Sequence, residues 1–248
     1  MNRLIPMPLS TFPIPPDWPK TLEAILERAR GLQRGGVLAF DLDSTVFDNR
    51  PRQARIVREF GTARGIPALI QCQPRHFTDG WDMRAAFRNC GLSAEDAEQL
   101  HPDARKFWMA RFFTSPYCAE DDVIAGAAAF LHRALATGAR IAYVTGRPER
   151  MRDGTLQAMQ RHGLPLPNGD TVLLLMKAAP EMHDDEYKRE AQARIATLGA
   201  VIAAFDNEPT HVNEYRRSFP DAVIVHLATD HSGRPVELLE GIVSVPHF

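Results

Sequence analysis

The chain has 248 residues, of which 44% are hydrophobic and 24% charged, a composition that excludes wholesale disorder and is typical of a folded globular protein. Its 29 basic and 31 acidic side chains give a formal net charge of −2, so no overall positive field is available to hold a nucleic acid backbone. No uninterrupted apolar stretch reaches the roughly 20 residues that cross a bilayer. We therefore expect neither nucleic acid nor a membrane as a partner.

The N-terminal segment and the cysteines bear on the cellular compartment. Prolines recur from Pro6 to Pro16 and break the apolar helix that a secretory signal needs. The three cysteines, Cys72, Cys90 and Cys118, form no Cys-x-x-Cys pair, which argues against a disulfide framework or a zinc knuckle. We expect a cytoplasmic protein whose cysteines are small core residues.

The elements expected along the chain begin with a proline-rich extension and a helix within residues 1–36. Short apolar runs of the buried-strand type follow, at 37–40, 140–144, 171–175, 201–205 and 222–226. Helical patterns lie between the later runs, at 122–136, 148–161, 185–198 and 210–218. Strands that alternate with helices predict right-handed βαβ units, and hence an α/β fold with a doubly wound, Rossmann-like parallel sheet.

A long insertion interrupts this alternation. Roughly 75 residues separate the first strand from the second, far more than an ordinary connection needs. The interval contains helical patterns at 53–63, 81–89, 93–100 and 102–113, and Ser93 resembles a helix cap. Its aromatic residues would give it a small core of its own. We expect an inserted helical cap over 50–119, and a catalytic core made of 37–49 and 120–248.

Polar residues follow the strands of the predicted core. In open parallel sheets, ligands bind beyond the carboxyl ends of the strands. In strand order these residues are Asp41-Leu42-Asp43-Ser44-Thr45, Thr145-Gly146-Arg147, Lys177 with Lys188 further on, and Asp206-Asn207-Glu208.

The residue types suit phosphoryl transfer. Asp41 and Asp43 are two residues apart on an extended segment, so their carboxylates can point the same way. One can attack phosphorus, and the other can protonate the leaving oxygen and later deprotonate water. Mg²⁺ prefers oxygen ligands, and Asp206 can supply a second carboxylate. The Thr145 hydroxyl, the Gly146 amide and a lysine can donate to the phosphoryl oxygens.

These motifs, in this order, resemble the four motifs of the haloacid dehalogenase (HAD) superfamily, and the insertion is similar to the family's C1 cap. The resemblance covers residues 37 to 226. It implies that Asp41 is the nucleophile and Asp43 the general acid/base, whose backbone carbonyl also reaches Mg²⁺. It further implies that Thr145 binds phosphate and that Asp206 is a metal ligand.

Two parts of the resemblance leave alternatives open. The third-motif lysine is expected at the start of the helix before the fourth strand, which favours Lys188 over Lys177. The fourth motif lacks its usual second acid, because Asn207, Thr210 and His211 occupy those positions. Asn207 or Glu208 could instead hold a magnesium-bound water. Thr45 and Arg147 are further candidates for supporting the site.

The cap residues also allow two interpretations. The basic ones could bind a second anionic group of the substrate, but a charged helix surface is favoured; they are Arg75, His76, Arg84, Arg88, Arg105 and Arg111. Trp81, Phe107 and Trp108 are expected in the core of the cap rather than in a substrate wall. His183 and His211 are expected at the surface.

The resulting hypothesis is a Mg²⁺-dependent phosphohydrolase that acts on a small soluble phosphomonoester through an aspartyl-phosphate on Asp41. Asp43 argues against carbon–halogen cleavage, because family members with that activity lack this acid. A phosphotransferase or mutase on the same scaffold is the alternative. A receiver-like phosphorylated signalling module is disfavoured by the order of the motifs. The identity of the substrate and the oligomeric state do not follow from the sequence.

Overall fold

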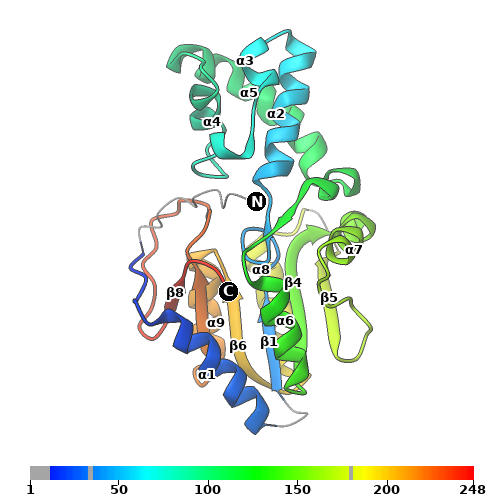
Figure 1. Cartoon of the computed structure of the whole chain (residues 1–248), viewed down its shortest axis with the longest axis vertical. Helices are drawn as coiled ribbons and strands as arrows, with labels where there is room; N and C mark the ends of the chain where they lie inside the picture. The colour runs from blue at the N-terminus through cyan, green and yellow to red at the C-terminus, as the bar shows by residue number, and fades with distance from the viewer. Residues whose placement is uncertain (1–11, 33–35, 179–180) are drawn as a thin grey trace.

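The computed structural model describes residues 12–32, 36–178 and 181–248 (Figure 1). At its centre lies a six-stranded sheet in the order β5-β4-β1-β6-β7-β8, with every neighbouring pair parallel. The strands are β1 (Gly36–Phe40), β4 (Arg140–Pro148), β5 (Val172–Lys177), β6 (Ala200–Asp206), β7 (Val223–Leu227) and β8 (Val243–Val245). The predicted α/β fold with a doubly wound parallel sheet is confirmed, and the three-residue strand β8 is an addition to it.

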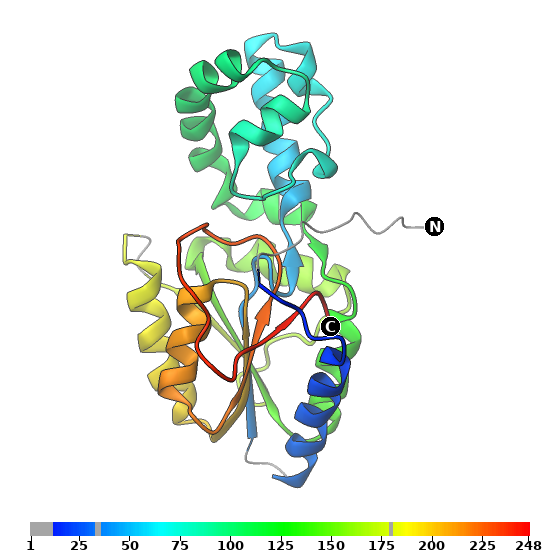
Figure 2. The ribbon, with the colours of Figure 1, turned by 90° about the vertical axis from the view of Figure 1, so that its left-hand side faces the viewer.

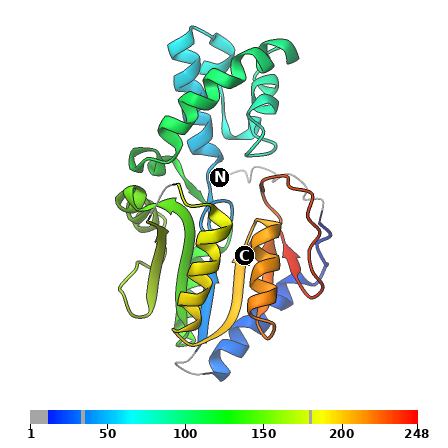
Figure 3. The same cartoon turned by 180° about the vertical axis from the view of Figure 1, so that it is seen from behind.

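Helices cover both faces of this sheet. One face carries α1 (Trp18–Gly31), α6 (Ala127–Ala136) and α7 (Arg152–Arg161), and the other carries α8 (Asp184–Ala196) and α9 (Pro209–Ser218) (Figures 1 and 3). The side chains of β1 alternate between the two layers: Leu38 and Phe40 pack towards the first set of helices, and Val37 and Ala39 towards the second. A strand that is buried on both faces needs a continuous apolar run, which is why the sequence revealed it.

Two helices of the core begin several residues later than predicted. The helix expected at 122–136 begins only at Ala127, because Gly126 has a left-handed φ of 79° and residues 122–123 pair as a strand. The helix expected at 148–161 begins at Arg152 after a 3₁₀ turn, η4 (Glu149–Met151). Pro148 has extended backbone angles (φ −68°, ψ 154°) and ends β4. Proline accepts both conformations, so its presence did not decide between them.

The cap is helical and has a hydrophobic core of its own. It contains α2 (Arg50–Arg64), α3 (Pro67–Ile70), η2 (Pro74–His76), α4 (Met83–Asn89), α5 (Ala94–Phe112) and η3 (Ser115–Glu120). Ser93 caps α5 as predicted, with its Oγ accepting from the Asp96 amide at 3.0 Å. The helices expected at 93–100 and 102–113 are one helix, which continues through Pro102. Trp108 and Phe112 of this helix are buried in the cap core, and we attribute its continuity to this packing.

A two-stranded antiparallel pair joins the cap to the core. β2 (Phe47–Asp48) pairs with β3 (Asp122–Val123), with Phe47 opposite Val123. Both ends of the cap therefore leave the core side by side, and the cap stands beyond the carboxyl ends of β1 and β4 (Figures 1 and 2). In the sequence, β2 comes just before the predicted cap, 50–119, and β3 just after it. The exact limits of the cap stay a prediction.

Two sequence expectations concern the remaining parts of the chain. The proline-rich segment lies outside the described residues up to residue 11, and the helix after it begins at Trp18 with Leu22, Ile25, Leu26 and Ala29 buried as expected. Within the described ranges, no helix is both long and apolar enough to cross a membrane.

Candidate active site

A tight turn after β1 presents the two aspartates of the first motif. The Asp41 amide still donates to a carbonyl of β6 at 2.9 Å, so this residue continues the sheet. The chain then reverses: the Phe47 amide donates to Leu42 O at 2.8 Å, and the Ser44 amide donates to Phe47 O at 2.7 Å. Ser44 takes a left-handed φ of 61°, which is uncommon for a residue other than glycine. Such strain often accompanies a functional turn.

Lys188 joins the first motif to the fourth. Its ammonium donates to Asp41 Oδ1 at 2.5 Å, to Asp206 Oδ2 at 2.9 Å and to Val144 O at 2.8 Å. Asp41 follows β1, Asp206 ends β6, and Lys188 lies in the second turn of α8. The Lys188 side chain is only 3% exposed, so all three of its hydrogen bonds lie in a region shielded from solvent. The structure thus brings three of the predicted site residues into direct contact.

The ionisation of this group reflects crowded negative charge. The pKa of Asp41 is raised to about 7, chiefly by burial; Asp206 and Asp43 contribute to the rise, and Lys188 opposes it. Burial also disfavours the charged form of Asp206, but Lys188 and His211 hold its pKa below the ordinary value. The two carboxylates keep the pKa of Lys188 well above its ordinary value despite burial. One ammonium therefore serves two buried carboxylates, with a third close by.

Asp43 is held by two arginines instead. Arg147 Nε donates to Oδ2 at 2.9 Å and Arg147 Nη2 to Oδ1 at 2.7 Å, while Arg52 Nη2 reaches Oδ1 at 3.3 Å. Both guanidinium groups also bind the buried Asp121, at 2.8 Å from Arg147 and 2.7 Å from Arg52. Burial alone would raise the pKa of Asp43, but the two arginines outweigh it and hold the pKa well below its ordinary value.

Two members of this network were not found by sequence reasoning. Arg52 comes from the first helix of the cap, and Asp121 from the segment that returns from the cap to the core. They are 69 residues apart, and neither stands in a motif. Arg147, by contrast, was a candidate because it follows Thr145-Gly146, and the structure directs it at Asp43.

A cavity of about 740 Å³ lies between the cap and the core. On the core side Asp41, Asp43, Gly146 and Asp206 line it, together with other residues that follow the strands. On the cap side it meets Trp81, which is 46% exposed. The expectation that Trp81 belongs to the cap core is therefore wrong: the residue precedes α4 and faces this opening. Phe107 and Trp108 do pack in the cap core, as expected.

Thr145 and Lys177 are not among the residues that line the cavity. Thr145 is fully buried, and its Oγ1 accepts a hydrogen bond from the Arg147 amide at 3.2 Å. Lys177 turns to Asp184 Oδ1 at 2.6 Å and to Met182 O at 3.1 Å. Of the two lysines considered for the third motif, the structure places Lys188 against Asp41.

Two residues of the fourth motif, Asn207 and Glu208, form part of the cavity wall and are held by hydrogen bonds. Asn207 Nδ2 donates to Asp230 O at 2.5 Å, and its Oδ1 accepts from Thr45 Oγ1 at 3.2 Å. Glu208 accepts from the amide and the hydroxyl of Ser232 at 2.9 and 2.8 Å. Both residues line the cavity, and their remaining acceptor capacity leaves open the predicted role of holding a metal-bound water.

His211 departs from the expectation of a surface histidine. Its Nδ1 lies 3.4 Å from Asp206 Oδ1 and its Nε2 lies 3.0 Å from Asp185 Oδ1, and the side chain is only 11% exposed. Burial opposes its charged form, but Asp206 raises the pKa above the ordinary value. His211 lies on α9, which packs against α8 and so meets Asp185. His183, in contrast, is exposed as predicted.

Among the six basic cap residues considered above, Arg105 lines the cavity. Two of the others form ion pairs on the cap surface: Arg84 with Glu98 at 2.5 Å, and Arg111 with Glu59 at 3.3 Å. The favoured interpretation of a charged surface fits these two. Arg105 remains available for a second anionic group of a ligand.

Comparison with known proteins finds a family match for part of the chain. Residues 105–206, which run from within α5 to the end of β6, match the model of the HAD superfamily, subfamily IIIB (Acid phosphatase). This part of the chain, which includes Thr145, Lys188 and Asp206, is similar to acid phosphatases of the haloacid dehalogenase superfamily. The predicted resemblance to this superfamily is confirmed over these residues, and the matched subfamily is one of phosphoric monoester hydrolases.

Solved structures are similar to this chain at low sequence identity. The protein tyrosine kinase A of Mycobacterium tuberculosis aligns with a TM-score of 0.51 and 17% identity over 86% of this chain and 95% of that one. A haloacid-dehalogenase-like hydrolase of Streptococcus pneumoniae has a TM-score of 0.47 and 14% identity over 84% and 92% of the two chains.

A class C acid phosphatase of Bacillus anthracis is also similar, with a TM-score of 0.41 and 17% identity. The alignment covers 75% of this chain and 63% of that phosphatase. No curated protein matches the chain by sequence.

Proposed function

We propose that the protein is a magnesium-dependent phosphatase that hydrolyses a small phosphomonoester through an aspartyl-phosphate on Asp41. The observation that carries this proposal is the contact of Lys188 with both Asp41 and Asp206 at the end of the sheet. A lysine that bridges these two carboxylates can hold the nucleophile and also neutralise a phosphoryl group that approaches it. The family match supports the reaction class.

The residues present fit a magnesium ion. The donors are the carboxylates of Asp41 and Asp206, whose oxygen atoms are the ligands that Mg²⁺ prefers, with the Asp43 carbonyl as the predicted third ligand. Burial and the acidic neighbours raise the pKa of Asp41 to about 7, so its ionised form is destabilised. A bound cation would stabilise this ionised carboxylate. Bound there, Mg²⁺ would draw negative charge from the phosphoryl oxygens.

In the first half-reaction a carboxylate oxygen of Asp41 forms a bond to phosphorus while the bond from phosphorus to the ester oxygen breaks. The ammonium of Lys188 offsets the charge that gathers on the phosphoryl oxygens. The departing oxygen takes a proton from Asp43 when it is a poor leaving group.

In the second half-reaction a water molecule attacks phosphorus and gives a proton to Asp43. The bond between phosphorus and the Asp41 oxygen breaks, which releases inorganic phosphate and restores the Asp41 carboxylate. Arg147 and Arg52 keep Asp43 ionised, which suits this step. The same contacts oppose the earlier proton donation, so we propose that donation by Asp43 limits the reaction of esters with poor leaving groups.

In this proposal the cap determines which substrates the enzyme accepts. Trp81 and Arg105 face the core residues across the cavity, so they would contact the organic part of the ester and any second anionic group on it. A hydroxyl compound that enters the same cavity could replace water as the acceptor, which is the phosphotransferase alternative. A small phosphorylated compound is the proposed partner, and a cytoplasmic location remains a prediction.

The test is hydrolysis of p-nitrophenyl phosphate with and without Mg²⁺ by the wild type, Asp41→Asn and Asp48→Asn. Asp48 follows in the same segment, but its carboxylate pairs with Arg50 at 2.7 Å and is not among the cavity-lining residues. We expect magnesium-dependent turnover in the wild type and in Asp48→Asn, and loss of turnover in Asp41→Asn. Full turnover in a folded Asp41→Asn variant would refute the proposal.

A further inference from the structure

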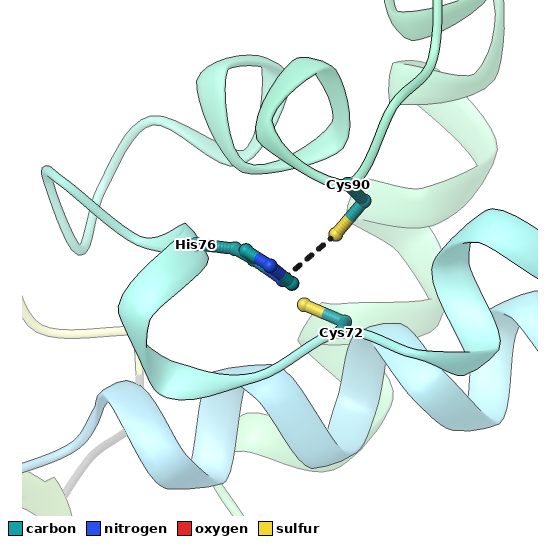
Figure 4. A group of neighbouring side chains, drawn as sticks. All are labelled: Cys72, His76 and Cys90. Atoms are coloured by element: carbon teal, nitrogen blue, oxygen red, sulfur yellow. Dashed lines mark hydrogen bonds between the residues drawn. The ribbon is translucent and has the colours of Figure 1, made fainter.

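Three potential metal ligands meet inside the cap, apart from the cavity-lining residues. They are Cys72, just after α3, His76 at the end of η2, and Cys90, which caps the C-terminus of α4 (Figure 4). Their ligand atoms all lie within 4.8 Å of one another, and Cys90 Sγ is 3.3 Å from His76 Nδ1. Cys72 is fully buried, and neither it nor Cys90 is in a disulfide.

The spacing of these atoms matches a tetrahedral site. Metal–sulfur and metal–nitrogen bonds of about 2.3 and 2.0 Å, typical of zinc, place a sulfur and a nitrogen ligand roughly 3.5 Å apart and two sulfurs roughly 3.8 Å apart. The observed 3.3 Å between Cys90 Sγ and His76 Nδ1 lies close to the first of these values, and the limit of 4.8 Å for all three ligand atoms is compatible with the second. Two thiolates and an imidazole favour zinc over magnesium, which prefers oxygen ligands.

The histidine already has the protonation state that a ligand requires. The Gln73 amide donates to His76 Nδ1 at 3.1 Å, so Nδ1 carries a lone pair and no proton. Metal binding would replace this hydrogen bond. Sequence spacing gave no sign of the site, because Cys72 and Cys90 are 18 positions apart in the chain and the site is assembled by folding.

We propose that Cys72, His76 and Cys90 bind one zinc ion, with the fourth position open to water. On binding, the two thiols release their protons to solvent and form metal–sulfur bonds, with no change of oxidation state. The site would act as a structural fastener of the cap. It would join the end of α4 to the segment that contains Cys72 and His76. That segment continues to Gly80, whose carbonyl accepts a hydrogen bond from Gln53 of α2, and then to Trp81, which lines the cavity.

The test uses Co²⁺ as a spectroscopic probe on the reduced full-length protein, with excess Mg²⁺ present to occupy the oxygen-ligand site. We expect one Co²⁺ per chain with thiolate-to-metal charge-transfer absorption and the visible bands of tetrahedral cobalt, both abolished by addition of Zn²⁺. Cys90→Ser and His76→Gln should lose or strongly weaken these bands. Cys118→Ser should retain them, because Cys118 is buried elsewhere and lies outside the cluster.

Thermal unfolding gives an independent measurement. Zn²⁺ should raise the melting temperature of the wild type and of Cys118→Ser, and should leave that of His76→Gln unchanged. Should Cys90→Ser fail to fold, His76→Gln still tests the site, because His76 is only partly buried. A reduced, folded wild type without thiolate–cobalt absorption would overturn the proposal. So would bands that survive in His76→Gln, or a Cys72–Cys90 disulfide whose reduction yields no metal binding.

Discussion

Arg147 holds Asp43 with two parallel hydrogen bonds, from Nε to Oδ2 at 2.9 Å and from Nη2 to Oδ1 at 2.7 Å. Such a bidentate pair fixes the orientation of the carboxylate as well as its charge. Arg52 adds a second guanidinium from the cap, so the proposed acid/base is bound by the core and the cap together. The protonation of Asp43 therefore depends on how the cap contacts the core.

A first prediction concerns the pH dependence that follows from Arg52. Because Arg147 and Arg52 hold the pKa of Asp43 below its ordinary value against the effect of burial, Arg52→Gln should raise this pKa. The pH profile of kcat/KM for an alkyl phosphomonoester should then shift to higher pH, since its leaving oxygen needs a proton. The profile for p-nitrophenyl phosphate, whose leaving group needs none, should keep its shape on the high-pH side.

Arg52→Lys is the matched control for this prediction, because it keeps a positive charge in the same place. It should shift the alkyl phosphate profile less than Arg52→Gln does. Equal shifts for both substrates would contradict the assignment of Asp43 as the proton donor.

A second prediction links Asp41 to stability. The folded protein holds the Asp41 proton more tightly than the unfolded chain does, because burial raises the pKa from 3.8 to about 7. The stability of the metal-free protein should therefore fall as pH rises from about 4 to about 7 on account of this group. Asp41→Asn should remove this pH-dependent loss of stability, so without metal at pH 8 the variant should melt a few degrees higher than the wild type.

Calorimetry of both proteins with and without Mg²⁺ checks this prediction. Magnesium should stabilise the wild type, because it binds the ionised carboxylate of Asp41. The difference in melting temperature between the wild type and Asp41→Asn should therefore become smaller. A metal-free Asp41→Asn variant that melts below the wild type at pH 8 would show that the folded protein does not destabilise the ionised form of Asp41.

A third prediction separates the two lysines. Lys188→Met should reduce kcat/KM by a factor of roughly 10² or more, because it removes a buried cation from the proposed phosphoryl site. Lys177→Met should leave kcat/KM near the wild-type value, because Lys177 pairs with Asp184 and is not among the residues that line the cavity. Steady-state kinetics on the two variants make the comparison, and the reverse order of effects would assign the third motif to Lys177.

Sequence reasoning located the core strands and the first and fourth motifs because these features are local. An apolar run such as 37–40 is visible without knowledge of its neighbours, and Asp41 and Asp206 follow directly from where two such runs end. The boundary at Gly126 was missed because apolar and alanine-rich residues continue a helical pattern across it.

Contacts between distant segments could not be predicted in the same way. Arg52 and Asp121 form a buried ion pair 69 residues apart, and their residue types alone resemble ordinary surface charges. His211 and Trp81 were assigned to the surface and to the cap core, respectively, because nothing local shows what faces them. The cluster of Cys72, His76 and Cys90 was missed for the same reason, since its spacing fits no short metal motif.

The central claim is that Asp41 carries the phosphoryl group, and the most direct measurement is capture of that intermediate. The enzyme would be mixed with a phosphomonoester labelled in its phosphoryl group and with Mg²⁺, quenched in acid during turnover, and digested for peptide mass spectrometry. Our account predicts one phosphoryl group on Asp41, lost on further incubation before the quench and absent from Asp41→Asn. Turnover with the label on another residue, or undiminished turnover by Asp41→Asn, would contradict it.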